Sequence, residues 1–291
     1  MKLVSYALLA VLLFSCNQSR TTDDHITGYI DIKDGKLYYE ESGIGEALVF
    51  IGGGGLMDSR QWQDQINFFR NKYRTISIDP RGIGNSEVPF TSFSNSDDLK
   101  MALDILKIDK AVIVGLSYAG GIALDFAVSN PDRISLLICS GPLISGWEFS
   151  ESMVEKQRIF FEASTKGVEE FIKVAFDQDP YFIPSPKNPK ARSFARSLIK
   201  ETFEVEGFDQ SLIAPLEPPT IQQVGEIKIP SLLIGGQLDH PDIHARIDFL
   251  DEQIDQSEKV IIQNAGHIVN MENPVELNIK LSDFLEKFLK K

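Results

Sequence analysis

Three residues of the types used in nucleophilic catalysis each follow a short apolar run in this chain of 291 residues. Ser117 follows the run from Ala111 to Gly115, Asp239 follows SLLIGG, and His267 follows KVIIQNAG. A serine hydroxyl is a poor nucleophile until a base takes its proton, and a histidine base needs an acid that fixes its tautomer. The order Ser, Asp, His therefore suits attack on a carbonyl group through a covalent intermediate.

Each of these residues also has a structural interpretation. Ser117 stands directly before a helical pattern from Tyr118 to Val128, and serine is a favoured N-cap residue. Asp242 lies close to Asp239 and is an alternative acid. Loops after parallel strands leave a sheet at one edge, so a parallel sheet would bring the serine, the acid and the histidine together. This convergence favours the catalytic interpretation.

The elements that must position these residues are indicated by the hydrophobic pattern. Residues 28–43 alternate apolar and polar residues around Asp34-Gly35, which predicts an antiparallel hairpin. Unbroken apolar runs then indicate strands buried on both faces, and hence a doubly wound, mostly parallel α/β sheet. These runs are Ala47–Ile51, Thr75–Ile78, Ala111–Gly115, Ile134–Cys139, Ser231–Ile234 and Lys259–Ile262.

No strand-like apolar run occurs between Pro142 and Ile227, where the sequence shows a helical pattern and proline-rich pieces instead. We expect residues 28–141 and 228–291 to form the core and residues 142–227 to form a helical cap. Several aromatic residues of the cap can line an apolar pocket or form the cap's own core. They are Trp147, Phe149, Phe160, Phe161, Phe171, Phe176, Tyr181 and Phe182.

Several motifs in order resemble those of the α/β-hydrolase superfamily. GLSYAGG around Ser117 resembles its nucleophile elbow, with Ala119 in place of the second glycine, and DPRGIGNS resembles its D-x-R-G-x-G-x-S loop. IPSLLIGGQLD resembles the strand and loop that deliver the acid, and NAGHIVNMENP supplies the histidine. The resemblance runs from about Gly28 to the C-terminus and implies Ser117, Asp239 and His267 as nucleophile, acid and base.

The resemblance also implies an oxyanion hole made of backbone N–H groups. Tyr118 would supply one, and Gly54 the other, with Gly53 as the alternative. Relatives usually carry His-Gly in this loop, whereas Gly52 takes the place of the histidine here, which puts the rigidity of the loop in doubt.

Other candidate sites are weaker. The glycine run lacks the lysine and Ser/Thr of a phosphate-binding loop. His240 and His244 have the i, i+4 spacing of metal ligands, but Pro241 interrupts the helix between them. Asp79 and Arg81 are expected to pack internally. We therefore expect neither a metal nor a cofactor.

These features predict a serine hydrolase that cleaves a carboxylic ester or lactone of a small molecule through an acyl-enzyme. A proline-iminopeptidase-like aminopeptidase or a C–C bond hydrolase is the alternative, and Glu201, Glu204 and Glu206 are candidate ligands for a peptide amine. A non-catalytic surface binding protein is the alternative of another class.

The N-terminus has the anatomy of a signal peptide, with Lys2 followed by an apolar run from Leu3 to Phe14. Its ending LFSC resembles the lipobox of bacterial lipoproteins, which implies a signal peptide at residues 1–15, lipidation of Cys16 and a polar tether at residues 16–27. We expect an exported protein anchored in a bacterial cell envelope, with a soluble secreted or periplasmic protein as the alternative.

The charge and the cysteines restrict the partners and the covalent framework. The net charge of -13 argues against nucleic acid and anionic membrane surfaces as partners. If Cys16 is lipidated, Cys139 is the remaining cysteine, expected to be buried and without a disulfide.

Overall fold

The computed structural model describes residues 25–184, 188–203 and 209–289. Within these ranges the chain forms one eight-stranded sheet in the order β1-β2-β4-β3-β5-β6-β7-β8. β2 pairs antiparallel with β1 and β4, and the other neighbours are parallel. The strands are β1 His25–Ile32, β2 Gly35–Ser42, β3 Ala47–Ile51, β4 Arg74–Ile78, β5 Ala111–Leu116, β6 Ile134–Ser140, β7 Ser231–Gly236 and β8 Ser257–Ile262.

All six apolar runs are strands, and the hairpin is present. The predicted turn is wrong by one residue, because Ile32 pairs with Gly35 and the loop consists of Lys33 and Asp34. Asp34 adopts a φ of 58°. Aspartate tolerates this left-handed conformation better than most residues, so the turn does not need to use the adjacent glycine.

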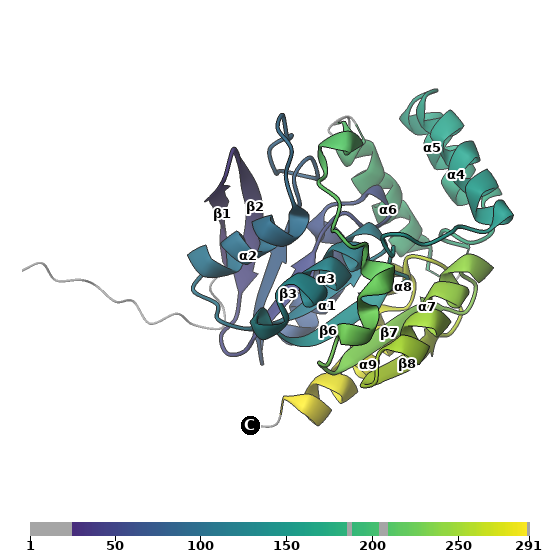
Figure 1. The fold of residues 1–291 in the computed structure, drawn as a ribbon. Coiled ribbons are helices and arrows are strands. Elements are labelled where there is room, and N and C mark those ends of the chain that lie inside the picture. Colours follow the sequence, from purple (N-terminus) through teal and green to yellow (C-terminus); the bar gives the residue numbers. More distant parts are fainter. Residues whose placement is uncertain (1–24, 185–187, 204–208, 290–291) are drawn as a thin grey trace, which may run out of the picture.

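Helices cover both faces of the sheet, as expected for a doubly wound fold (Figure 1). The helices α2, α3 and α7 pack on one face, and α1, α8 and α9 pack on the other. Alternate residues of β5 face opposite cores, with Ile113 in one and Val112 and Val114 in the other. The helix bounds are α1 Gln63–Phe69, α2 Asn95–Ile105, α3 Tyr118–Ser129, α7 Pro241–Gln253, α8 Val269–Glu272 and α9 Pro274–Phe288.

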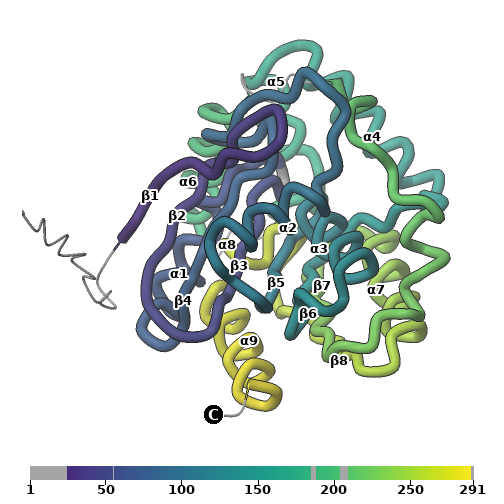
Figure 2. The backbone as a smooth tube through the Cα atoms, turned by 60° about the vertical axis from the view of Figure 1, so that its left-hand side comes forward, coloured from purple at the N-terminus to yellow at the C-terminus, as the bar shows by residue number. Residues whose placement is uncertain are grey.

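A helical segment, here called the cap, lies between β6 and β7. It contains α4 Glu151–Ser164, α5 Val168–Lys173, a π-helical turn at Val174–Gln178 and α6 Pro189–Thr202. Phe171, Ile172, Ala175 and Phe176 are buried, as their helical spacing predicts. Figures 1 and 2 both place α4–α6 toward one end of the sheet and the C-terminus toward the other.

The expected signal peptide and Cys16 lie outside the described residues. None of the helices that the structure describes is both long and apolar enough to cross a bilayer. Cys139 is fully buried on β6 and its thiol lies 3.6 Å from Gly120 O, while burial raises its pKa. A thiol in these surroundings is not a reactive nucleophile.

Candidate active site

Ser117 occupies a sharp turn between β5 and α3. Its φ of 57° and ψ of -116° lie outside the regions that a residue with a Cβ atom normally adopts. Backbone bonds hold this conformation: Ser117 N–H donates to Ser140 O at 2.8 Å, and the N–H groups of Gly121 and Leu143 donate to Ser117 O at 3.0 Å. Although Ser117 stands at the N-cap position of α3, its hydroxyl makes no capping bond. A strained turn retained without a capping bond is typical of a functional position.

The residues around this turn must be small. A Cβ atom on Gly115 would lie 2.2 Å from Ala119 O, and one on Gly120 would lie 2.9 Å from Pro142 Cβ. Ala119 itself is fully buried, so its methyl group is accommodated at the motif position where glycine is usual. The departure from the usual motif therefore leaves the turn intact.

His267 and Asp239 are in direct contact. His267 Nδ1 lies 2.8 Å from Asp239 Oδ2, and their side chains are only 12% and 3% exposed. The backbone N–H of His267 donates to Tyr181 O and Phe182 O, which ties the histidine loop to the cap. Asp239 Oδ1 accepts the His240 N–H at 2.7 Å. The aspartate is therefore held in position to fix the tautomer of the imidazole.

Asp242 performs a different task. Its Oδ1 accepts the Ser150 N–H at 2.8 Å at the start of α4, and its Oδ2 lies 3.5 Å from Arg246 Nε. The acid that contacts His267 is thus Asp239. Glu272 supports the same loop, because its Oε1 accepts the Gly266 N–H at 2.8 Å.

The three residues predicted from the sequence lie on the wall of one cavity of about 810 Å³. Ser117, Asp239 and His267 all line it, with side chains from the core and the cap. Most of its surface is apolar, which suits a small organic substrate. Its aromatic lining consists of Tyr118, Phe149, Phe160, Phe161, Phe171, Phe182 and Phe203.

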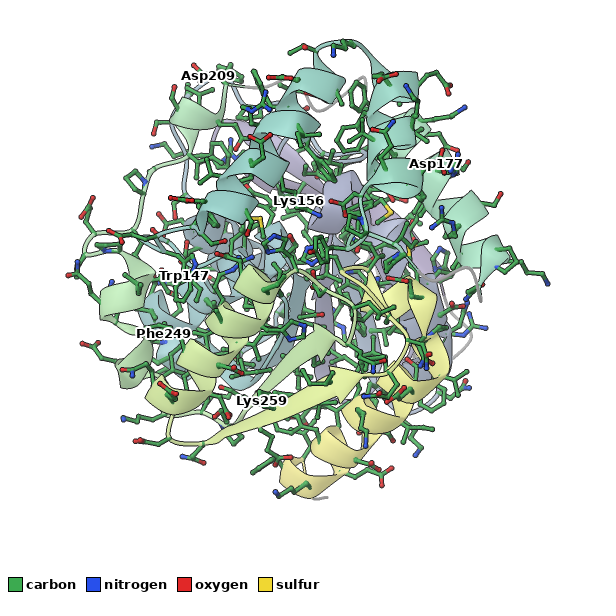
Figure 3. All side chains as sticks on the ribbon, turned by 90° about the vertical axis from the view of Figure 1, so that its right-hand side faces the viewer. Trp147, Lys156, Asp177, Asp209, Phe249 and Lys259 are labelled. Carbon is green, nitrogen blue, oxygen red and sulfur yellow. The ribbon has the colours of Figure 1, made fainter. Side chains whose placement is uncertain are left out.

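Five of the eight cap aromatics singled out in the sequence line this cavity. Several of them also form a cluster within the cap, because the Phe160 ring lies 5.5 Å from that of Phe171 and 6.0 Å from that of Phe182. Trp147 instead packs on Phe249 of α7 (Figure 3). The same rings therefore build part of the cap's core and the cavity wall.

The glycine loop after β3 approaches the elbow closely. A Cβ atom on Gly54 would lie 2.6 Å from Leu116 Cδ2 and 2.9 Å from Leu116 O. The Gly53 N–H already donates to Met57 O at 2.8 Å. The Gly54 N–H donates no such hydrogen bond to a backbone carbonyl of the described residues. The free N–H favours Gly54 as a donor to a ligand, whereas Gly53 and not Gly54 is among the residues that line the cavity. Tyr118, the first residue of α3, lines the cavity with Gly53.

Asp79 fills the space beside Gly52. A Cβ atom on Gly52 would lie 2.8 Å from both Asp79 Oδ1 and Ser59 N, and these two atoms are joined by a hydrogen bond of 2.8 Å. Burial raises the pKa of Asp79 to about 7, although it also accepts the Asn85 N–H. The loop after β3 is therefore fixed by a buried carboxyl group.

Arg81 also packs internally, as expected. Its guanidinium donates to both carboxylate oxygens of Asp98, at 2.6 and 2.8 Å, and to Lys33 O and Asp34 O. The pair is buried on the side of the hairpin turn. It joins β1, the DPRGIGNS loop and α2.

Three cationic or imidazole side chains on the cavity wall were not singled out as substrate-binding residues in the sequence. Lys156 comes from α4, His240 precedes α7, and Arg246 lies within α7. The described residues contain no group of three or more His, Cys, Asp or Glu side chains suited to a metal ion. His240 Nδ1 accepts the Asp242 N–H at 3.1 Å. In the sequence, His240 stands out for its i, i+4 spacing to His244 and for its position directly after Asp239, and neither feature indicates a place on the cavity wall.

Comparisons with known proteins agree with this architecture. The family model described as "alpha/beta hydrolase fold" matches residues 46–274. The chain is 26% identical over 274 residues to 3-oxoadipate enol-lactonase 2 of Acinetobacter baylyi, covering 91% of this chain and 98% of that protein. It is 26% identical over 272 residues to a Bacillus subtilis protein named uncharacterized carboxylesterase nap, covering 88% and 85%.

A solved structure shows the same fold. The thermophilic esterase of Thermogutta terrifontis superposes with a TM-score of 0.71 at 22% identity, covering 91% of this chain and 99% of that one. The chain belongs to the α/β-hydrolase family. With esterases and an enol-lactonase among its relatives, it is a hydrolase enzyme.

Proposed function

We propose that this enzyme is a serine hydrolase that cleaves a carboxylic ester or lactone of a small molecule through an acyl-enzyme. The 2.8 Å contact between His267 Nδ1 and Asp239 Oδ2, on the wall of the cavity that Ser117 also lines, carries the proposal. A base whose Nδ1 contacts a carboxylate and a hydroxyl on a strained turn therefore line the same cavity, and this supports a serine nucleophile. The apolar lining supports a small organic substrate.

The reaction follows from these positions. Asp239 accepts a hydrogen bond from His267 Nδ1–H and remains ionised, so the Nε2 lone pair is free to take the proton of Ser117 as its Oγ attacks the substrate carbonyl carbon. The backbone N–H groups of Tyr118 and Gly54 stabilise the resulting oxyanion. His267 then protonates the leaving alcohol, and water attacks the acyl-enzyme by the same proton transfers, releasing the acid.

A fluorophosphonate probe tests the nucleophile directly. Purified protein should be labelled at Ser117, and Ser117→Ala should abolish both labelling and ester cleavage. Ser129, an exposed serine at the end of α3, provides the matched control variant Ser129→Ala. Equal labelling of the Ser117→Ala and wild-type proteins would exclude the proposed nucleophile, and absence of labelling from both would support a non-catalytic binding protein.

Two other kinds of bond, a C–C bond and a peptide bond, are alternatives to the ester bond as the bond that is cleaved. Other relatives include a 2-hydroxy-6-oxononadienedioate/2-hydroxy-6-oxononatrienedioate hydrolase of Paraburkholderia phymatum, 27% identical over 290 residues, with 91% of this chain and 97% of that protein covered. This relative favours C–C hydrolysis as a second candidate. A panel of esters, lactones, vinylogous diketones and aminoacyl amides separates the possibilities, and exclusive cleavage of diketones or amides would contradict ester hydrolysis.

An aminopeptidase receives less support. Among the described residues that line the cavity, Asp239 is the only acid. Glu201 binds Arg60 at 2.6 Å and is not part of the cavity wall, while Glu204 and Glu206 lie outside the described residues. Within the described part of the cavity wall, a substrate ammonium group therefore has no carboxylate partner besides the one that contacts His267.

We also propose that the protein is exported and anchored through a lipid on Cys16. The apolar run and the LFSC ending support this proposal. Cys16→Ala should move the protein from the membrane fraction to the soluble fraction of expressing cells, whereas Cys139→Ala should not. Unchanged partitioning of Cys16→Ala would contradict lipidation.

A further inference from the structure

One wall of the cavity carries side chains that donate hydrogen bonds and that the proposed reaction does not use. Lys156 extends from α4 of the cap, and His240 precedes α7 of the core. In Figure 3, Lys156 lies beneath the cap helices toward the middle of the molecule, whereas Asp177 lies at their outer side. The ring of Tyr181 connects the two donors, because Lys156 Nζ lies 5.4 Å from its centroid and the His240 ring lies 4.8 Å from it.

The ammonium group of Lys156 is held with donor capacity left over. Its Nζ lies 2.7 Å from Asp179 Oδ2, and Asp179 Oδ1 is fixed by the N–H groups of Tyr181 and Phe182. The same Nζ lies 4.8 Å from the centroid of the Phe160 ring. An ammonium has three N–H donors, and one of them is used by Asp179.

The imidazole of His240 is fixed in one tautomer. Its Nδ1 accepts the Asp242 N–H at 3.1 Å as the N-cap of α7, so the ring proton of the neutral form is on Nε2. No hydrogen bond from the described residues engages Nε2. Burial and the nearby charge of Lys156 lower the pKa of His240, which keeps the ring neutral. His240 thus presents an uncharged N–H donor.

The charges of this wall cancel in pairs. Lys156 is paired with Asp179, and Arg246 with Asp242 at 3.5 Å. Asp239, which contacts His267, adds a negative charge beside His240. A substrate carboxylate would therefore find donors but no net positive charge, whereas a neutral carbonyl oxygen would gain hydrogen bonds without opposing charge.

We propose that His240 and Lys156 form a subsite for an uncharged hydrogen-bond acceptor of the substrate, such as a second carbonyl oxygen near the ester that is cleaved. This inference rests on the proposed hydrolase function and names a substrate class within it. The preferred substrates are esters or lactones that carry a further neutral carbonyl group. His240 and Lys156 are specificity-determining residues, and neither takes part in bond cleavage.

Matched esters test the substrate class. p-Nitrophenyl 4-oxopentanoate should have a kcat/KM about five- to tenfold above that of p-nitrophenyl pentanoate, as expected for one or two net hydrogen bonds. The kcat/KM of p-nitrophenyl monosuccinate, which carries a carboxylate in place of the ketone, should be lower than that of the 4-oxopentanoate. A second pair, 4-oxopentyl and pentyl butanoate, places the ketone on the alcohol side. Equal kcat/KM values within both pairs, or preference for the succinate, would overturn the proposal.

Two variants assign the preference to the named side chains. Asparagine can still cap α7, so His240→Asn removes the Nε2 donor while keeping an acceptor for the Asp242 N–H. Lys156→Met keeps an unbranched side chain of similar length but removes Nζ, the atom that contacts Asp179 and the Phe160 ring. Each variant should reduce the ratio of kcat/KM for the oxo and plain esters toward one. Lys173→Met, at an exposed lysine of α5, is the matched control and should leave the ratio unchanged. If the ratio of kcat/KM for the oxo and plain esters stays at its wild-type value in both His240→Asn and Lys156→Met, the proposal is overturned.

A binding measurement separates the subsite from catalysis. In the Ser117→Ala protein, calorimetry should give a Kd for the oxo ester at least threefold below that for the plain ester. Failure of the wild-type protein to cleave any ester would overturn the proposed function, while the Kd comparison would still test the subsite. Equal Kd values for the two esters would overturn the subsite and leave Ser117-dependent ester cleavage standing.

Discussion

At the scale of single residues, two neighbouring aspartates have separable tasks. Asp239 contacts the imidazole of His267, whereas Asp242 binds the Ser150 N–H and Arg246. We expect Asp239→Asn to lower kcat on the order of ten-thousandfold, because the asparagine favours the wrong tautomer of the imidazole and cannot charge-stabilise the imidazolium. Asp242→Asn should mainly destabilise the fold, by about 3 kcal/mol, because it removes the carboxylate nearest to the buried Arg246 guanidinium.

Ester kinetics and urea denaturation of both variants check this assignment. Wild-type protein carried through the same urea series supplies the reference midpoint. A loss of kcat confined to Asp242→Asn, with Asp239→Asn near wild type, would reverse the two roles.

A second residue-scale prediction concerns Asp79. Burial raises its pKa to about 7 from an ordinary value of 3.8. The folded state therefore keeps a proton that the unfolded state loses, so the contribution of Asp79 to stability is lost as the pH rises from about 4 to about 7. Between pH 5 and pH 7.5 the wild-type protein should lose about 2 kcal/mol relative to Asp79→Asn, at roughly 1.4 kcal/mol per pKa unit.

Urea denaturation of the two proteins at both pH values measures the change in their stability difference. The comparison with Asp79→Asn removes the titration of every other group. A wild-type stability that rises relative to the variant over this range would contradict the raised pKa.

At the scale of elements, the loop after β3 depends on the absence of a side chain at Gly52. A Cβ atom there would press against Asp79 Oδ1 and Ser59 N, each 2.8 Å away. Gly52→Ala should lower the free energy of unfolding by about 1–3 kcal/mol, the usual effect of overpacking, and should also lower kcat/KM because Gly54 moves with the loop.

Gly225 provides the matched control for this substitution. A Cβ atom at Gly225 would meet only Gln253 O, at 3.8 Å. Gly225→Ala should stay within about 0.5 kcal/mol of the wild-type stability. An equal effect of the two substitutions on denaturation midpoint and kcat/KM would show that the crowding at Gly52 is relieved elsewhere.

The strands could be predicted from the sequence because each buried strand is an unbroken apolar run, and that pattern depends on local residues alone. The two residues of the hairpin loop could not be predicted in this way. Both Asp34 and Gly35 tolerate a positive φ, so only the register of the paired strands decides which of them lies in the loop. Within the site, the order of Ser117, Asp239 and His267 was visible as positions after strands. The wall formed by Lys156 and His240 could not be predicted from the sequence, because the two residues come together only where the cap meets the core.

At the scale of the whole molecule, the net charge of -13 bears on which substrates reach the cavity. A chain of this charge repels anionic esters over a distance set by the Debye length, about 30 Å at 0.01 M salt and less than 10 Å at 0.3 M. Raising NaCl over this range should increase kcat/KM for the monosuccinate ester by about threefold and leave that of p-nitrophenyl pentanoate nearly constant.

The neutral ester is the internal control, because salt effects on the enzyme itself act on both substrates. The ratio of the two kcat/KM values therefore reports the field at the cavity entrance. If added salt lowers this ratio, the entrance attracts anions and the wall of Lys156, His240 and Arg246 carries an effective positive charge. That result would contradict the pairing of its charges, and the natural substrate would then be sought among carboxylates.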